Sequence, residues 1–380
     1  MINNKFKALW YMIILSFFTI IFKLFFFLNK KQIWFFIDRP FGVDNAYFIY
    51  KYVKKNDKNI KSIYLCENKK DAYFKDLLKD KNVVYKFSLR HLWYFVHAKN
   101  LIFSFDTDPF YFYKQGLIFK KLLKPKTKMI FLQHGVIHSL LPPYSKKYTH
   151  FDMFVCSARR EMDQIKNDVM NYYSELKLTG LPRFDKLHNS LKDKIIFFMP
   201  TWNNKLLGKS IKEFKSSSYF KSINSFLSSN KLKQLLIKYD YKLCFIMHYM
   251  FNDYISLFNF NNSSIDIIKM NQSKEIIFPL KLKSSLLITN YSSVLFDFAY
   301  MKKPTLYYQF DKYHFKEDFN YKTEGFGKVV KTSDMLLIEL EKILKNNCKM
   351  DKKYVKRVEN FFEHIDANNC KRNYEEIKNL

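Results

Sequence analysis

The sequence predicts two consecutive α/β domains, each built on a parallel sheet, preceded by a hydrophobic N-terminal helix. Short apolar runs alternate with charged, helix-compatible stretches, which is typical of strands joined by crossover helices. The alternation starts again after a polar stretch at residues 188–194. A chain of 380 residues is long enough for two domains that each bury a core.

The N-terminal segment, residues 1–31, contains an apolar run from 8 to 28 that only Ser16, Thr19 and Lys23 interrupt. At about 1.5 Å per residue, such a helix could cross a hydrocarbon core of about 30 Å. Three interpretations stay open: a helix lying in the membrane interface, a full span, and a buried helix of the first domain. No small-residue cleavage site follows, so we do not expect a removed signal peptide.

The first domain is predicted at residues 32–190 and the second at 191–380, where the charged helical tail from 333 to 380 is included. We expect the strands of the first domain at 33–37, 63–65, 83–85, 101–104, 129–132 and 153–156. Those of the second are expected at 195–199, 243–247, 286–289 and 305–308. The segment 275–282 is ambiguous because Pro279 interrupts a helix pattern. Two doubly wound, Rossmann-like domains facing a cleft form the GT-B architecture, in which ligands bind at the carboxyl ends of strands.

Net charge and cysteine content favour some classes of partner and compartment without selecting one function. The formal net charge of +30 favours acidic partners such as phospholipid headgroups or a polyphosphate substrate, although biased genome composition would also produce it. No basic, aromatic-interleaved module is present, so we do not expect nucleic-acid binding. The five cysteines form no C-x-x-C pair, which is typical of a reducing compartment without disulfides or zinc.

A polar turn follows the buried run at 286–289. Asn290, Ser292 and Ser293 can cap the next helix, and the free backbone N–H groups there could hold a diphosphate. Asp297 lies four residues further on the same helical face. An ordinary serine cap without a ligand is the alternative.

Two histidines end predicted strands, one in each domain. His134 follows the strand at 129–132, with Gly135 relaxing the turn, and could accept a proton from an attacking hydroxyl. His248 follows the strand at 243–247 and could neutralise donor phosphate or act as the base. Hydrogen bonding to loop backbone is the structural alternative for each.

Two further loops could bind phosphate through Arg183 and Thr201, although turn formation alone explains both. The chain lacks G-x-x-x-x-G-K-[ST] and G-x-G-x-x-G loops. The one D-x-D pair that could hold a metal is Asp106-Thr107-Asp108, and we expect neither a metal nor a cofactor.

Four motifs together resemble the CDP-glycerol:glycerophosphate glycerophosphotransferases, which include teichoic acid primases and polymerases and related capsule enzymes. They are Gln133-His134-Gly135, Gly180-Leu181-Pro182-Arg183-Phe184-Asp185, Met199-Pro200-Thr201-Trp202 and the run from Ile288 to Phe298. Asp44-Asn45 and Gly325-Phe326-Gly327 also fit, so the resemblance covers residues 33–332.

The resemblance implies a GT-B enzyme that moves glycerol phosphate or ribitol phosphate from a CDP-polyol donor and releases CMP. It implies that the acceptor is a hydroxyl of a teichoic acid, of capsule, or of another lipid-linked or glycan molecule. It also implies attachment to the anionic, cytoplasmic face of the membrane, through residues 8–28. In the family pattern His134 matches the proposed base, His248 the second-domain histidine, and Asn290, Ser292, Ser293 and Asp297 the donor turn and its helix. The family usually has Asp at Asn290 and Pro at Tyr249, which leaves donor choice and turnover open. The alternative function is a nucleotide-sugar glycosyltransferase of surface polysaccharide synthesis.

Overall fold

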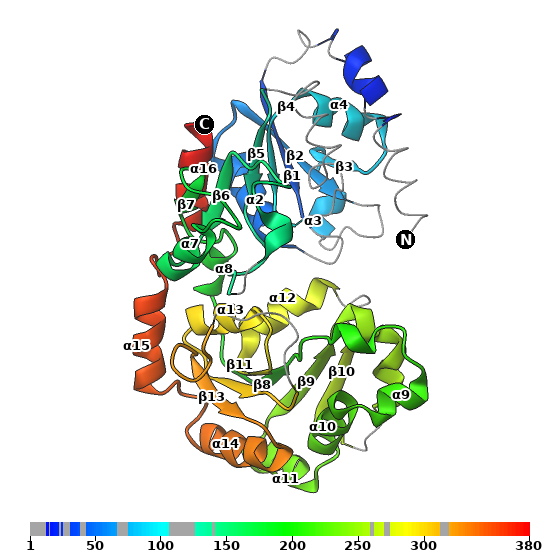
Figure 1. Ribbon diagram of the computed structural model, residues 1–380, viewed down its shortest axis with the longest axis vertical. Coiled ribbons are helices and arrows are strands. Elements are labelled where there is room, and N and C mark those ends of the chain that lie inside the picture. The colour runs from blue at the N-terminus through cyan, green and yellow to red at the C-terminus, as the bar shows by residue number, and fades with distance from the viewer. Residues whose placement is uncertain are drawn as a thin grey trace. The chain divides into compact units, whose positions relative to one another are not determined.

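The computed structural model describes residues 13–14, 16–22, 24–25, 31–38, 43–66, 75–105, 126–138, 141–258, 262–269, 274–311 and 319–380. The chain divides into two compact units (Figure 1). The first unit comprises residues 1–136, 141–185 and 366–380, and the second comprises 137–140 and 186–365. Each unit is organised around one parallel sheet with helices against it, which confirms the predicted pair of Rossmann-like domains.

The first unit holds a seven-stranded sheet in the order β3-β2-β1-β4-β5-β6-β7. Its strands are β1 (Gln32–Ile37), β2 (Ile60–Cys66), β3 (Val83–Tyr85), β4 (Ala98–Phe103), β5 (Lys128–Phe131), β6 (Met153–Cys156) and β7 (Leu176–Leu178). Its helices are α2 (Asn45–Asn56), α3 (Lys75–Leu78), α4 (Leu89–His97), α7 (Arg159–Ile165), α8 (Phe184–Leu187), α16 (Asn369–Lys378) and the 3₁₀ turn η3 (Pro142–Tyr144). Strand order reverses between β1 and β4, so the loops after these strands diverge at a topological switch point.

The second unit holds a six-stranded sheet in the order β10-β9-β8-β11-β12-β13. Its strands are β8 (Asp193–Phe198), β9 (Lys242–Met247), β10 (Ile265–Lys269), β11 (Ser284–Thr289), β12 (Thr305–Tyr308) and β13 (Gly327–Val330). Its helices are α9 (Ile211–Ser216), α10 (Ser218–Leu227), α11 (Asn230–Tyr239), α12 (Lys274–Lys283), α13 (Val294–Tyr300), α14 (Ser333–Lys345), α15 (Lys352–Phe361) and the 3₁₀ segments η4 (Asn204–Leu206) and η5 (Tyr249–Leu257). The ambiguous segment around Pro279 is therefore helical.

The central strands of both sheets are buried on both faces, as expected of parallel sheets covered by helices, whereas the edge strand β10 is largely exposed. In β1 the five residues from Ile33 to Ile37 are all buried, and β11 is buried along its whole length. The strands consequently read as continuous apolar runs, which is why the sequence locates most of them. The predictions missed the short strands β7, β10 and β13.

The last helix differs from its predicted place. Residues 366–380 belong to the first unit, whereas the sequence assigned the whole tail to the second domain, and the chain passes between the units at 185/186 instead of 190/191. Helix α16 packs beside α2: the Tyr374 hydroxyl donates to Asp57 Oδ2 at 2.7 Å, and its ring lies 5.9 Å from that of Trp34. These partners lie more than 300 residues away along the chain, so local pattern could not assign the helix.

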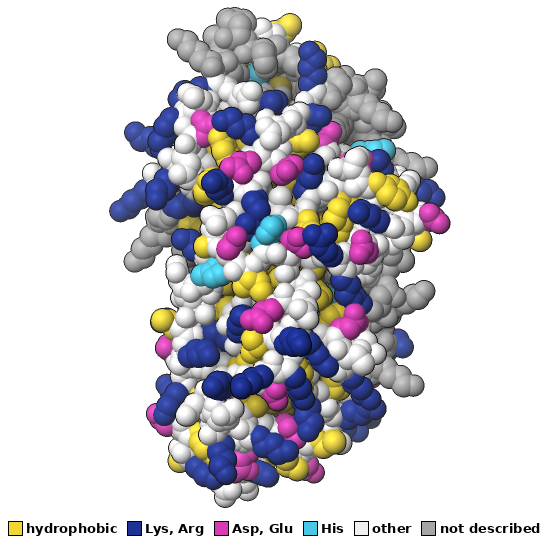
Figure 2. Space-filling view, turned by 90° about the vertical axis from the view of Figure 1, so that its left-hand side faces the viewer, with side chains coloured by type: hydrophobic (Ala, Val, Ile, Leu, Met, Phe, Trp, Pro, Cys, Tyr) yellow, Lys and Arg dark blue, Asp and Glu magenta, His cyan; other side chains and the backbone are white. Residues whose placement is uncertain are grey.

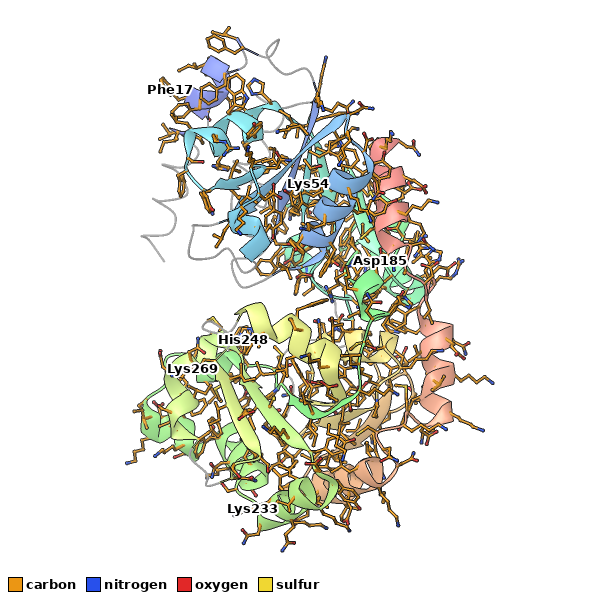
Figure 3. All side chains as sticks on the ribbon, turned by 180° about the vertical axis from the view of Figure 1, so that it is seen from behind. Phe17, Lys54, Asp185, Lys233, His248 and Lys269 are labelled. Atoms are coloured by element: carbon orange, nitrogen blue, oxygen red, sulfur yellow. The ribbon has the colours of Figure 1, made fainter. Side chains whose placement is uncertain are left out.

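Part of the hydrophobic N-terminal segment is described, and residues 16–22 are helical. Phe22 contacts the ring of Trp93 in α4, and its carbonyl lies 2.9 Å from His97 Nε2. The opposite side exposes Ile13, Phe17, Ile20 and Leu24 (Phe17 is labelled in Figure 3). Within the described part of the chain, no helix has the length and hydropathy needed to cross a bilayer.

Candidate active site

The second unit brings most of the predicted donor residues to one edge of its sheet. Thr201 follows β8 and Asn290 follows β11, and these strands are neighbours. The Thr201 amide donates to Asn290 Oδ1 at 2.7 Å, and the Tyr291 amide donates to the same oxygen at 2.8 Å. Asn290 is buried and thus joins the two loops through its side chain. The Thr201 hydroxyl is also buried and has no hydrogen-bond partner within the described ranges, so it can still donate to a ligand.

Ser292 and Ser293 form the turn that enters α13. The Val294 amide donates to Ser292 Oγ at 3.4 Å, whereas the Ser293 side chain makes no capping bond. The amides of Ser292 and Ser293 donate to no atom of the described residues. Helix α13 has only seven residues, so attraction for an anion here comes from local N–H and hydroxyl donors more than from a long helix dipole.

Asp297 lies inside this helix and is almost completely buried. Its carboxylate accepts a hydrogen bond from the Lys281 ammonium of α12, which lies 4.9 Å from the centre of the Phe278 ring. The pair joins α12 to α13, so the structure gives Asp297 a packing role. Its predicted contact with the donor stays a prediction.

His248, labelled in Figure 3, directly follows β9, the strand on the other side of β8 from β11. Its imidazole stacks on the Trp202 indole with ring centres 5.7 Å apart and an interplanar angle of 27°. Nδ1 accepts from the Met250 amide at 3.4 Å, which favours the tautomer that carries its proton on Nε2. A neutral His248 can therefore donate through Nε2 to a phosphoryl oxygen, while Trp202 restrains the ring.

In the first unit, His134 lies just beyond β5, half-buried, with its ring 5.1 Å from that of Phe105 in an edge-on arrangement. The left-handed residue of this turn is Gln133, with φ of +60°, whereas Gly135 is not among the left-handed residues of the described chain. Sequence pattern gives no signal for this, since glutamine rarely adopts φ above zero. The predicted relaxing role of Gly135 stays a prediction.

Arg183 is buried, and its guanidinium contacts other loops of the first unit. Nη1 donates to Asp44 Oδ1 at 2.9 Å and to the His134 carbonyl at 2.7 Å. The arginine predicted to bind phosphate thus lies directly against the backbone of the predicted base. Whether it also contacts a donor stays a prediction.

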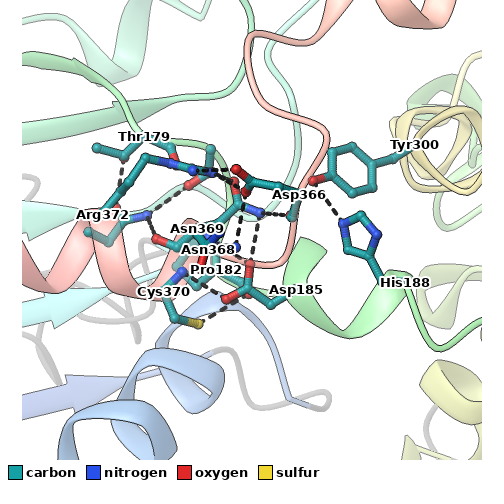
Figure 4. Close-up of polar contacts among 12 residues, drawn as sticks. Thr179, Pro182, Asp185, His188, Tyr300, Asp366, Asn368, Asn369, Cys370 and Arg372 are labelled. Carbon is teal, nitrogen blue, oxygen red and sulfur yellow. Dashed lines mark hydrogen bonds and ion pairs between the residues drawn. The ribbon is translucent and has the colours of Figure 1, made fainter. Parts of the chain in front are cut away.

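The other residues of the Gly180–Asp185 loop hold α16 in place (Figure 4). The Asp185 carboxylate accepts from the amides of Asn369 and Cys370 at 2.7 and 2.9 Å. Asn373 Nδ2 donates to the Gly180 carbonyl at 2.8 Å. The motif therefore supports the first unit through contacts that join residues 180–185 to residues more than 180 positions later.

The junction between β1 and α2 is occupied by an internal carboxylate. Asp38 accepts from the amides of Asp44 at 3.0 Å and Tyr47 at 2.8 Å, and from the Tyr64 hydroxyl at 3.0 Å. Burial, with the neighbouring Asp44 charge, raises the pKa of Asp38 to about 6. In doubly wound folds the first strand–helix junction is a common place for ligand phosphate. Here Asp38 accepts from the amides of Asp44 and Tyr47, so these two donors are already used within the protein.

The structure thus gathers Thr201, His248, Asn290, Ser292 and Ser293 at the carboxyl edge of the second sheet. His134 and Arg183 meet at the carboxyl edge of the first. The sequence analysis gave no role to several supporting side chains: Glu161 and Lys281 lie in none of its motifs, and Asn45, Gln133 and Trp202 appear there only as parts of the family motifs. The Asp106-Thr107-Asp108 pair lies outside the described residues, and the described ones contain no cluster of three or more acidic, histidine or cysteine side chains that could hold a metal.

Comparisons with known proteins identify the family of the chain and support its fold. The family model for CDP-glycerol:poly(glycerophosphate) glycerophosphotransferase matches residues 16–379. The minor teichoic acid biosynthesis protein GgaB of Bacillus subtilis is 33% identical over 93% of the chain, which spans only 40% of that protein's length. A teichoic acid poly(glycerol phosphate) polymerase of Bacillus spizizenii is 24% identical, with 88% of each protein covered.

Solved structures show the same fold. The wall teichoic acid polymerase TagF gives a TM-score of 0.63 at 18% identity, covering 99% of this chain and 98% of that one. A UDP-GlcNAc 2-epimerase of Methanocaldococcus jannaschii gives 0.56 at 12% identity, covering 92% and 100%. The family model spans nearly the whole chain, and the chain therefore belongs to the CDP-glycerol:poly(glycerophosphate) glycerophosphotransferase family.

Proposed function

We propose that this protein transfers glycerol phosphate from CDP-glycerol to a hydroxyl of a teichoic acid acceptor and releases CMP. The observation that carries the proposal is the gathering of Thr201, His248 and the 290–293 turn at one edge of the second sheet. Family membership and the relatives' names support it, as does a TagF variant studied after soaking with CDPG, with a TM-score of 0.66. The same chemistry could also transfer ribitol phosphate or use a capsule acceptor. An assay must separate these variants from the proposed reaction.

In the proposed reaction, an acceptor oxygen attacks the phosphorus that carries glycerol. The new P–O bond forms while the P–O bond to the bridging pyrophosphate oxygen breaks, and CMP leaves with that oxygen. His134 takes the proton of the acceptor hydroxyl, since a neutral imidazole is a suitable base near neutral pH. The Ser292 and Ser293 donors and His248 offset charge on the phosphoryl oxygens, which is the main requirement of phosphoryl transfer.

The test measures CMP release from CDP-glycerol, CDP-ribitol and UDP-sugars with purified teichoic acid primer as acceptor. We expect turnover with a CDP-polyol and a decrease of roughly 10²–10⁴-fold in His134→Ala, the usual range for a general base. His188→Ala is the matched control, because that histidine contacts Tyr300 at the C-terminal end of α13 and is not one of the proposed residues. Release of a nucleotide from UDP-sugars alone would replace the proposal with glycosyl transfer.

Donor binding has its own test. The double variant Ser292→Ala with Ser293→Ala removes two hydroxyl donors, each worth about 1.5–3 kcal/mol toward a charged group. We expect CDP-glycerol to bind at least tenfold more weakly in calorimetry, whereas the exposed Ser228→Ala should bind normally. Equal affinity in the double variant would remove the 290–293 turn from the donor site.

We also propose that the N-terminal segment contacts an anionic membrane at its cytoplasmic face. Ile13, Phe17, Ile20 and Leu24 recur at helical spacing and are exposed, while the other side of the segment packs on α4. Lys and Arg side chains spread over both units in Figure 2, and the net charge is +30, so an anionic surface would attract the protein.

Point variants test this better than deletion, because removing Phe22 would uncover Trp93. Phe17→Lys with Ile20→Lys should reduce co-sedimentation with phosphatidylglycerol vesicles. Ile237→Lys, which changes an equally exposed isoleucine of α11, should not. Unchanged sedimentation of the double variant would exclude this stripe as the contact.

A further inference from the structure

We infer that Gln133, anchored by Glu161 and Asn45, is a positioning residue that fixes the direction of the His134 side chain. The inference rests on the proposed role of His134 as the base. It concerns how the first unit holds that histidine, and the contacts that carry it all lie inside that unit.

Gln133 has an unfavourable backbone conformation in a fully enclosed place. Its φ is +60° and only 1% of its surface is exposed. A left-handed conformation costs a residue with a Cβ about 1–2 kcal/mol, so it persists only where surrounding contacts enforce it. Glycine would adopt this backbone without strain. The side chain therefore has a use that glycine could not supply.

The Gln133 side chain anchors the turn to β6 and α7, the strand and helix that follow it in the chain. Gln133 Nε2 donates to the Val155 carbonyl and to Glu161 Oε1, the latter at 3.1 Å. Both partners are acceptors, so the orientation of the amide is determined by its contacts. The anchor holds the chain in the left-handed turn at the end of β5.

Glu161 is itself fixed. It lies in the first turn of α7, is 1% exposed, and its Oε2 accepts from the Ser157 amide at 2.7 Å and the Ser157 hydroxyl at 3.2 Å. A carboxylate in the first turn of a helix is also favoured by the helix dipole. Glu161 thus connects the turn of Gln133 to a rigid element.

Both peptide groups that flank the His134 Cα accept hydrogen bonds from other segments of the first unit. The carbonyl of Gln133 accepts from Asn45 Nδ2 at 2.6 Å, and the carbonyl of His134 accepts from Arg183 Nη1 at 2.7 Å. Asn45 and Arg183 are joined in turn, because the Arg183 amide donates to Asn45 Oδ1 at 3.0 Å.

Fixing the two peptide planes fixes the backbone dihedrals of His134, and therefore the direction of its Cα–Cβ bond. A displacement of about 1 Å in a catalytic group can cost on the order of 10²-fold in rate. Loss of the Gln133 anchor should thus act through the imidazole of His134, while the donor residues of the second unit keep their contacts.

A double-mutant cycle tests the inference, with CMP release from CDP-glycerol as the assay. Gln133→Gly relieves the backbone strain and removes the anchor, and Glu161→Gln replaces one acceptor oxygen with an amide donor. We expect each to lower kcat roughly 10–100-fold with little change in KM for CDP-glycerol. In the His134→Ala background the same changes should lower kcat by less than about threefold, since groups acting as a unit are strongly non-additive.

The outcomes separate the two hypotheses. If His134→Ala leaves kcat unchanged, the proposed function of His134 fails. If His134→Ala is impaired but Gln133→Gly lowers kcat equally in both backgrounds, only the positioning role is overturned. Glu175→Gln is the matched control, because Glu175 is a carboxylate of the same unit that pairs with Lys146 and does not contact Gln133. Circular dichroism melts test whether Gln133→Gly remains folded. If this variant unfolds, Glu161→Gln provides the same comparison.

Discussion

Replacing Gly180 with alanine should detach α16 from the first unit. A Cβ at Gly180 would lie 1.9 Å from Asn369 Oδ1 and 2.9 Å from Asn369 Cγ, and φ of +78° disfavours any side chain. The left-handed backbone costs about 1–2 kcal/mol and forced overpacking about 1–3 kcal/mol. The total of roughly 2–5 kcal/mol corresponds to about thirtyfold to several-thousandfold in the opening equilibrium of the helix.

Hydrogen exchange followed by mass spectrometry on peptides from 369–378 measures this opening. Gly208→Ala is a matched control, because φ there is +69° but no atom lies within 4 Å of the added Cβ. The Gly208→Ala variant has the backbone penalty without the steric clash, so the amides of α16 should stay protected from hydrogen exchange.

A second comparison isolates the steric effect. In an Asn369→Ala background the nearest recorded atom of residue 369 would be Cβ, at 3.6 Å, which is an ordinary contact. Gly180→Ala should then add only the backbone penalty. Unchanged exchange of α16 in Gly180→Ala, or an equal effect in both backgrounds, would refute the reasoning.

Two further predictions concern buried charges of the second unit. Burial lowers the pKa of Lys303 to about 7, with Nζ donating to the Leu282 carbonyl at 2.6 Å. The unfolded chain therefore binds more protons than the folded chain between about pH 7 and 10.5, so the free energy of unfolding should rise with pH across that window. Urea melts at pH 7 and 9 measure this rise, which should vanish in Lys303→Met. Asp297→Asn should destabilise the second unit by about 3–5 kcal/mol because it breaks the buried ion pair with Lys281. Lys281→Met with Asp297→Leu should recover much of that loss in the same melts. A normal urea midpoint for Asp297→Asn would show that the ion pair contributes little.

The sequence by itself determined the class of fold and the strand ends at which the candidate residues lie. Parallel strands buried on both faces must be apolar along their length, so runs such as 195–199 and 286–289 predict them directly. Polar residues that directly follow such runs must lie at one edge of the sheet, which is why the sequence predicts that Thr201, His248 and the 290–293 turn lie along the same edge. The same argument placed His134 beyond β5.

Only the tertiary structure decided what these residues touch. Arg183 pairs with Asp44 across 139 positions, and Asp185 caps a helix 184 positions later. The left-handed turn of Gln133 depends on Glu161 and Asn45, which no local pattern connects to it. These arrangements follow from packing distant segments together and satisfying each buried polar group, and neither condition is visible in hydrophobic periodicity.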